Sequence, residues 1–368
     1  MFFFMVSFNL IMPELNNFLT QLGGEDYKGY IIALFTLAAG LARPFSGKLA
    51  DKIGRKQVMY VGLLVSILSN FVYPFVSVIW LFLLLRFFHG FSTGFHPTGA
   101  TAMVSDILPE NRRGEGMGVF GTSMSLGMGL GQSLGTPVAN WLGMNGLFLS
   151  AAGIGVISAV LLLRVEETLS EKERFKRKML LVKKNEIFDP LVTPVAITMF
   201  LSSYCSGLIL VLMPDLSGYL GIGNKGLFFI FYVASTIMVR TFMGKLSDRI
   251  GRRQTLFYGM LILLGAIILL AFAGNLVLFI IAATVFGIAT GITSPTLFAW
   301  TADLSNPSNK GRGTGTMFIA LEMGIMSGAL STLVFYTNNL ETLQTCLYVG
   351  AIMCILALGY LQTIRSKY

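Results

Sequence analysis

The chain has 368 residues, of which 54% are hydrophobic and 12% are charged, and its formal net charge is +9. Soluble domains carry about 25% charged residues. A soluble fold of this length could not bury so much apolar surface. The composition therefore excludes an ordinary soluble protein and predicts an all-α polytopic membrane protein.

Twelve hydrophobic segments are candidates to cross the bilayer, since a spanning helix needs about 20 apolar residues. The predicted spans are 1–20, 28–49, 56–74, 77–104, 114–140, 144–164, 191–213, 225–246, 254–273, 275–302, 313–336 and 343–363. The first span begins at Met1 with no basic leader region, so we expect no cleaved signal peptide.

The basic residues are distributed unevenly between the connecting loops. With the N-terminus placed inside, the cytoplasmic segments hold 22 of the 27 Lys and Arg, whereas the outer loops hold Lys28 and Lys225. This bias predicts that both termini are cytoplasmic. It also accounts for the positive net charge without nucleic acid as a partner. The predicted location is a plasma membrane, with the bacterial inner membrane favoured.

A long polar segment divides the spans into two sets of six. We therefore predict an N-terminal six-helix bundle over 1–164, a cytoplasmic linker over 165–189 and a C-terminal six-helix bundle over 190–368. Mixed charges and scattered apolar residues suggest a partly helical linker at the membrane surface. Docking to anionic lipid is the alternative.

The two halves of the chain repeat each other. Residues 43–57 and 240–254 are identical at 10 of 15 positions, at an offset of 197. The same offset pairs Gly62 with Gly259, Gly90 with Gly287, Gly94 with Gly291, Asp106 with Asp303 and Gly118 with Gly315. "MPEL" at 12–15 likewise matches "MPDL" at 213–216. We infer an internal duplication of six helices, related by an axis along the membrane normal.

The most similar stretches are two short charged turns, "GKLADKIGRK" at 47–56 and "GKLSDRIGRR" at 244–253. Glycine at each end would permit a tight turn close to a neighbour. Asp51 at membrane level could cap the positive N-terminus of an adjacent helix. Such a contact could break and re-form when two bundles move. The alternative is a basic turn that only orients the protein in the membrane.

The first turn resembles the signature between helices two and three of the major facilitator superfamily, and the second resembles its weaker copy. The resemblance covers essentially the whole chain. It implies alternating access, with Asp51 in a contact that favours the outward-open state and Asp248 as its counterpart. The predicted conformational latch comprises Gly47, Asp51, Gly54, Arg55, Lys56, Gly244, Asp248, Gly251, Arg252, Arg253, Arg43 and Arg240.

Ionisable residues inside a membrane are candidates for function. Arg86 lies nine residues into the fourth span, roughly 14 Å deep at 1.5 Å per residue, and its repeat counterpart is Ala283. The stretch 86–94 is similar to the fourth-helix motif of proton-coupled members of the family. We expect Arg86 to hold a carboxylate or a substrate anion, or else to form a structural ion pair. His89 could relay protons, or it could be a buried neutral histidine.

Three acids complete the predicted substrate and proton cavity with Arg86 and His89. Glu322 lies roughly 16 Å deep in the eleventh span. It could carry a proton, bind a cationic substrate or be a hydrogen-bonded structural acid. Glu14 and Asp215 occupy matching places toward the outer ends of spans one and seven. They could form a gate, or they could be helix-terminal acids in headgroup water.

The fifth span contains a glycine-rich stretch, "GMGLGQSLGTP" at 127–137. A Gly–Pro motif at this place is typical of antiporters in the family. Here Gly131 and Gly135 are present, but Gln132 stands where proline is expected. We predict a helix-packing motif formed by Gly131, Gln132 and Gly135.

These features predict a monomeric secondary transporter of a small organic solute, with protons as the coupling ion and efflux favoured. A proton-coupled importer of a metabolite or sugar is the alternative, followed by a non-transporting receptor or scaffold on the same fold. The sequence has no phosphate-binding loop, nucleophile elbow or metal-ligand cluster. We therefore expect neither an enzyme nor a cofactor or metal, and no ATP-driven step.

Overall fold

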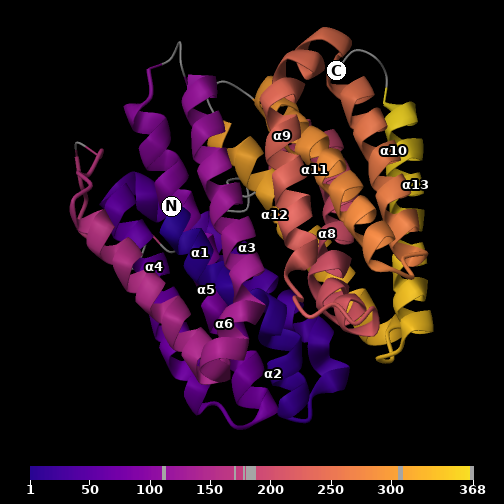
Figure 1. The fold of residues 1–368 in the computed structure, drawn as a ribbon. Helices are drawn as coiled ribbons and strands as arrows, with labels where there is room; N and C mark the ends of the chain where they lie inside the picture. Colours follow the sequence, from indigo (N-terminus) through magenta and orange to yellow (C-terminus); the bar gives the residue numbers. More distant parts are fainter. Residues whose placement is uncertain (110–112, 170, 177–178, 180–187, 306–309, 365–368) are drawn as a thin grey trace. The chain divides into compact units, whose positions relative to one another are not determined.

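The computed structural model describes residues 1–109, 113–169, 171–176, 179, 188–305 and 310–364. Its regular structure within these ranges is helical, with no strand (Figure 1). The chain divides into two compact units. Unit 1 comprises Met1–Gly24 and Leu34–Lys183, and unit 2 comprises Glu25–Ala33 and Lys184–Tyr368.

Unit 1 is built from the N-terminal helices. Their bounds are α1 Phe2–Leu10, η1 Met12–Glu14, α2 Leu15–Gln21, α3 from Lys28 (in unit 2) to Ile53, α4 Arg55–Val72, η3 Tyr73–Phe75, α5 Ile79–Ile107 and α6 Arg113–Leu163. Pro13 lies in η1 and interrupts the first span, because proline has no N–H to donate to the helix ladder. Gly143, with φ 72°, breaks the long helix α6 into two arms. These arms match the predicted spans 114–140 and 144–164.

Unit 2 contains the C-terminal helices. Their bounds are η6 Pro190–Val192, α8 Thr193–Tyr219, α9 Leu227–Ile250, α10 Arg252–Ala271, α11 Leu276–Leu304, α12 Lys310–Phe335 and α13 Leu340–Thr363. The short helix η2, Glu25–Tyr27, precedes α3 and belongs to the same unit. Unlike Pro13, Pro214 remains inside a continuous helix, α8.

The helices have the length and hydropathy of an integral membrane protein. Within the described part of the chain, eight helical stretches meet both criteria for crossing a bilayer. They coincide with nine of the twelve predicted spans, because Val119–Leu163 holds two. The other three predicted spans coincide with α1–α2, α5 and α9. Helical segments suit a bilayer because each backbone N–H and C=O is paired within the segment. The total of twelve crossings stays a prediction.

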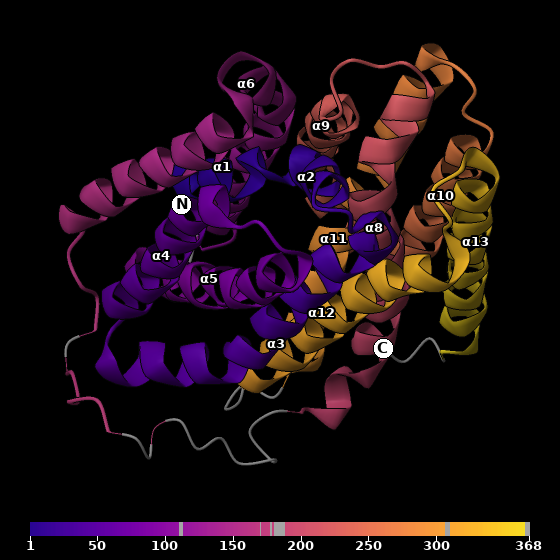
Figure 2. The same ribbon diagram turned by 90° about the horizontal axis from the view of Figure 1, so that it is seen from below.

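Glycines allow the helices of each unit to pack closely. In unit 1, α6 packs against α1 and α4 against α5, while in unit 2, α12 packs against α8 and α10 against α11 (Figure 2). A Cβ at Gly90 of α5 would overlap Phe35 O, and one at Gly287 of α11 would overlap Tyr232 O. These two contacts differ by 197 residues on both sides, so the duplicated sequence produces duplicated packing.

The segment after α6 packs against the first charged turn. Residues 165–169 and 171–176 contain no helix, whereas Met179 has 3-10 helical geometry and its N–H donates to Lys176 O at 2.8 Å. The partly helical linker over 165–189 stays a prediction. Glu173 N donates to Lys52 O at 2.8 Å, and the buried Met179 packs among Leu49, Ala50 and Val58. The segment thus takes part of its hydrogen bonds and apolar contacts from α3 and α4.

Candidate functional site

Arg86 on α5 is fully buried at the centre of a polar cluster in unit 1. Its Nη1 donates to Tyr73 Oη and to His89 Nδ1, both at 3.4 Å. Its Nη2 lies 3.9 Å from Met12 Sδ, and its guanidinium stacks over the Phe35 ring at 4.6 Å. Apolar and aromatic surfaces thus enclose a permanent positive charge in the middle of the unit.

The contacts of His89 define its tautomer. A guanidinium only donates hydrogen bonds, so His89 Nδ1 must be an acceptor. Tyr73 Oη also lies 3.2 Å from Nδ1, and Ser66 Oγ lies 3.4 Å from Nε2. The proton of the neutral imidazole is therefore on Nε2, facing Ser66. Its proton-relay role stays a prediction.

Further buried polar atoms lie on α4 and α5, the helices that carry Ser66, Arg86 and His89. Asn70 Nδ2 and Oδ1 on α4, and Ser92 Oγ and His96 Nε2 on α5, have no hydrogen-bond partner among the described residues. The other ring nitrogen of His96 bonds Met59 O at 3.0 Å. Buried polar groups are normally paired with protein or water, so these atoms mark the α4–α5 interface as unusually polar.

Glu14 and Asp215, which the sequence pairs, are placed in separate environments. Glu14 is buried in unit 1, where it accepts hydrogen bonds from Thr136 at 2.8 Å and from Asn17 at 3.2 Å. Asp215 lies in α8 of unit 2 and forms an ion pair with Lys28 at 2.7 Å. Neither is a solvated helix-terminal acid, because both are largely enclosed.

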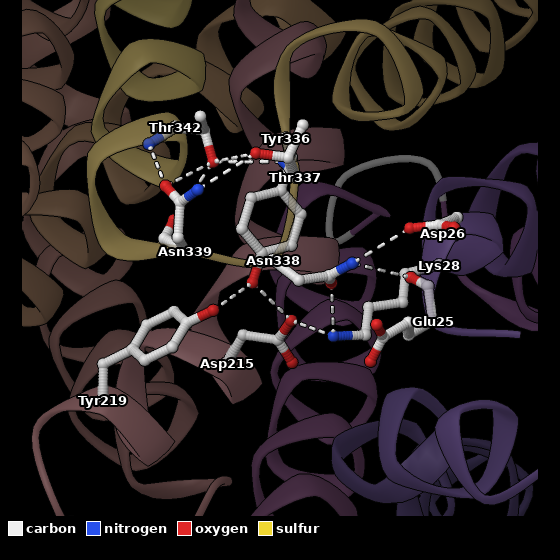
Figure 3. A network of polar contacts seen from close by, with 10 residues as sticks. All are labelled: Glu25, Asp26, Lys28, Asp215, Tyr219, Tyr336, Thr337, Asn338, Asn339 and Thr342. Atoms are coloured by element: carbon white, nitrogen blue, oxygen red, sulfur yellow. Dashed lines mark hydrogen bonds and ion pairs between the residues drawn. The ribbon is translucent and has the colours of Figure 1, made fainter. Parts of the chain in front are cut away.

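Figure 3 shows the polar network around Asp215. Tyr336 Oη donates to Asp215 Oδ2 at 2.7 Å and lies 3.0 Å from Tyr219 Oη. Lys28 Nζ also donates to Asn338 Oδ1 at 2.8 Å. Glu322, the remaining predicted cavity acid, is buried in α12. The described contacts bring Arg86 and His89 together, and they bring Asp215 together with residues that the sequence did not single out.

The first charged turn is formed at Gly54 alone. Gly54 has φ 126°, which a side chain rarely tolerates. Gly47 instead lies inside α3, where a Cβ would meet no described atom within 4 Å. The expected turn with glycine at both ends is therefore corrected to a helix that ends at Ile53. Arg43, on the same helix, is half-buried.

Arg55 connects this turn to the end of α5. Its Nε donates to Asp106 Oδ2 at 3.0 Å, and its Nη2 lies 3.3 Å from the exposed Asp51. Lys56 Nζ donates to Leu163 O at the end of α6, at 3.0 Å. Each of the two cations has a specific partner because the turn brings them against two helix ends.

Glu167 binds the start of α4 from the segment after α6. Its two carboxylate oxygens accept hydrogen bonds from the backbone N–H groups of Arg55 and Lys56, at 3.0 and 3.1 Å. The carboxylate therefore occupies the position of a helix N-terminal anion. Asp51 of α3 is paired with Arg55 of α4 across the turn, and its role as a cap on a neighbouring helix stays a prediction.

The second turn repeats part of this arrangement. Gly251 has φ 89°, Arg252 Nε donates to Asp303 Oδ2 at 2.8 Å, and Arg253 Nε donates to Leu361 O at the end of α13. The side chain of Asp248 lies outside the described ones, so the latch roles of Asp248 and Gly244 stay predictions, as does that of Arg240. Asp106 and Asp303 were detectable beforehand from their 197-residue spacing, whereas Glu167 was not.

The glycine-rich stretch of α6 packs on α1. A Cβ would overlap Val6 O from Gly131 and Leu10 O from Gly135. Gln132 is buried, and its Nε2 donates to Asn9 Oδ1 at 3.2 Å. Close backbone approach on a helix–helix face is consistent with the predicted packing motif.

Comparisons with known proteins agree with this architecture. The family model described as Major Facilitator Superfamily matches residues 1–195 and again 195–366. The chain is 27% identical to a protein of Lactococcus lactis named multi-drug resistance efflux pump PmrA homolog, covering 89% of this chain and 84% of that one. It is also 27% identical to multidrug resistance protein 2 of Bacillus subtilis, covering 97% and 91%.

A solved structure shows the same fold at lower sequence identity. The human organic anion transporter MFSD10 (TETRAN) is 20% identical, with a TM-score of 0.74 over 98% of this chain and 96% of that one. The repeated family match, the helices with membrane-spanning hydropathy and the duplicated packing all agree. The chain is a multi-pass membrane protein that belongs to the Major Facilitator Superfamily.

Proposed function

We propose that this secondary transporter of small solutes exports an organic solute in exchange for protons, by alternating access in a bacterial inner membrane with both termini cytoplasmic. The observation that carries the proposal is the buried polar cluster of Arg86, His89 and Tyr73 in one half of a duplicated apolar scaffold. Intramembrane ionisable groups of this kind mark substrate and proton pathways. The names of the bacterial relatives support the direction of transport.

Each member of the proposed cavity has a role that follows from its chemistry. Arg86 keeps its charge at all relevant pH values, so it holds an anion or a carboxylate and does not carry the proton. Glu322 and Glu14 are buried carboxyl groups, and intramembrane acids commonly line proton pathways. They are our candidates for the proton-carrying acids. His89 positions Arg86 through Nδ1.

Proteoliposomes distinguish exchange from co-transport without control of protein orientation. We expect ethidium, used as the probe, to accumulate when the lumen is more acidic than the medium, because protons then leave as the dye enters. Accumulation only with an acidic medium would indicate an importer, and dye movement that ignores the gradient would exclude proton coupling. Glu322→Gln should reduce the dependence on the gradient, and protein-free vesicles provide the background.

For the charged turn, we propose that Asp51 biases the equilibrium between the transport states. It is exposed and paired with Arg55 at 3.3 Å, so the partner it meets in another state can compete for it. Asp51→Asn should slow ethidium flux while leaving yield in the membrane unchanged. Glu171→Gln, an exposed acid on the linker, is the matched control. Equal rates in the two variants would remove the role of Asp51.

A further inference from the structure

The ammonium group of Lys28 is enclosed on three sides within unit 2. Asp215 Oδ2 lies 2.7 Å from Nζ, Asn338 Oδ1 lies 2.8 Å away, and the centre of the Tyr336 ring lies 5.7 Å away (Figure 3). The side chains of Lys28 and Asp215 are only 11% and 13% exposed. A carboxylate, an amide oxygen and an aromatic face can each bind an alkylammonium ion.

The groups around the Lys28 ammonium are also positioned by contacts that do not involve Lys28. Tyr336 Oη donates to Asp215 Oδ2 and contacts Tyr219 Oη, so the carboxylate and the ring fix each other. Asn338 has φ 56°, the one left-handed non-glycine residue of the described chain. Its Nδ2 donates to Asp26 Oδ1 at 3.3 Å, which turns Oδ1 toward the ammonium. The binding groups therefore remain oriented when Lys28 leaves.

A purely structural role is a weak explanation for an ammonium here. An enclosed ion pair adds little to stability compared with apolar residues, because both charges lose their hydration. The network also reaches the surface, since Tyr219 is 42% exposed.

We propose that Asp215, Asn338 and the Tyr336 ring form a binding site for a primary alkylammonium group of the transported solute, with Lys28 as its tethered competitor. The proposal rests on the proposed function, because it assigns amine-bearing solutes to the transporter. Lys28 returns to the site when the solute leaves, so the carboxylate is never left unpaired. The binding energy of the amine is reduced by the cost of displacing the lysine.

Truncation of the competitor tests the site directly. In the purified chain, Lys28→Ala should lower the thermal unfolding temperature, and n-butylammonium, whose ammonium can take the place of Nζ, should restore it. We expect the variant to bind n-butylammonium on the order of tenfold more tightly than the wild type, because its site has no competitor. Neutral 1-butanol should restore nothing.

Two variants serve as controls. Lys28→Ala combined with Asp215→Asn should lose the response to n-butylammonium, and Lys225→Ala, which removes the other lysine expected in an outer loop, should show no gain in binding. If Lys28→Ala cannot be purified, Lys28→Gln with methylammonium replaces it. A monodisperse Lys28 variant with no amine-dependent shift, or a shift that survives Asp215→Asn, overturns the site.

A flux measurement separates this proposal from the function on which it rests. Phenethylammonium should inhibit ethidium flux in proteoliposomes, and more strongly in Lys28→Ala than in the wild type. Amine binding without inhibition overturns the assignment to the transported solute. If the wild type shows no gradient-driven ethidium flux, proton-coupled export is contradicted. The amine site is not, because the binding measurement needs no flux.

Discussion

The α4–α5 interface of unit 1 and the α10–α11 interface of unit 2 have the same architecture but opposite chemistry. Seven buried positions of the first are polar or charged, and the residues 197 positions later are also buried but, with one exception, apolar. The first set is Ser66, Asn70, Tyr73, Arg86, His89, Ser92 and His96. The second set is Leu263, Ile267, Leu270, Ala283, Phe286, Ala289 and Thr293.

The comparison separates what the fold requires from what transport requires. Gly62 faces His96 and Ser92, and Gly259 faces Thr293 and Ile292, so both interfaces keep the same close helix approach. Apolar residues complete that packing in unit 2, so the polar groups of unit 1 are not needed for it. Each unpaired buried polar group costs about 1–3 kcal/mol. We infer that unit 1 retains them for transport.

The largest effect should come from placing a charge in the apolar interface. Ala283 is fully buried in α11, and Ala283→Arg would bury a guanidinium among apolar residues. We expect destabilisation of about 3–5 kcal/mol, the cost of an uncompensated buried charge, seen as loss of the monodisperse peak in size-exclusion chromatography. Ala283→Met, which adds volume without charge, is the control. Normal yield of the arginine variant would show that unit 2 can also accommodate a charge.

The reciprocal change should abolish transport and keep the fold. Arg86→Met retains an unbranched side chain and removes the charge, so stability should be unchanged or higher. Ethidium flux driven by a pH gradient should fall at least about tenfold, as for a functional intramembrane charge. Thermal unfolding of the same preparation gives the stability. Flux at the wild-type level would assign Arg86 to structure.

A smaller effect on stability, opposite in sign to that of Ala283→Arg, is expected from substitution of Asn70. Its side-chain amide has no partner among the described residues, whereas Ile267 occupies the matching place in unit 2. Asn70→Val should raise the free energy of unfolding by about 1 kcal/mol, while Ile267→Asn should lower it. Thermal unfolding in the same detergent measures both. A loss of stability in Asn70→Val would indicate that a buried water holds the amide.

The smallest expected effect is the pH dependence of the contact between Lys52, beside the first charged turn, and Glu173. The hydrogen bond and charge of Lys52 hold the pKa of the Glu173 carboxyl below its ordinary value. Because the pKa of Glu173 is lower in the folded state than in the unfolded state, where it is about 4.3, the contact stabilises the fold above the unfolded pKa. This stabilisation is lost as the pH falls through the folded pKa. Hydrogen exchange of residues 165–176 should therefore accelerate below about pH 4, beyond the intrinsic pH dependence of exchange.

Glu173→Gln is the matched control for this pH response. The variant should exchange at pH 7 as the wild type does in acid, and it should respond little to further acidification. The second turn provides an internal reference, because Arg253 binds the carbonyl oxygens of Leu361 and Gln362. Equal acceleration at both turns would rule out a specific role for the Lys52–Glu173 pair.

The sequence was sufficient for features that depend on local composition or on the repeat. Hydropathy located helical segments at all twelve predicted spans, and the 197-residue offset anticipated the matching glycine contacts and the pair Asp106 and Asp303. Both kinds of evidence work because a spanning helix satisfies its own backbone and because a duplicated sequence packs in a duplicated way.

Features that depend on distant partners could not be predicted. Lys28 appeared only as an outer-loop cation, because Asp215 and Asn338 lie 187 and 310 residues away. Glu167 appeared as one acid in a mixed linker, and only the folded chain brings it to the start of α4. Gly47 was misassigned to the turn because glycine spacing does not reveal whether a helix continues through the residue.

The contacts of Lys56 with Leu163 O and of Arg253 with Leu361 O have a consequence for how each half responds to its surroundings. In each half, a cation in the first turn of the helix after the charged turn donates a hydrogen bond to a main-chain oxygen at the end of the last helix. Amide oxygens do not titrate in the physiological range, so a fall in pH does not protonate the acceptors of these two hydrogen bonds. A fall in pH can therefore protonate carboxylates in either half while these two contacts stay formed.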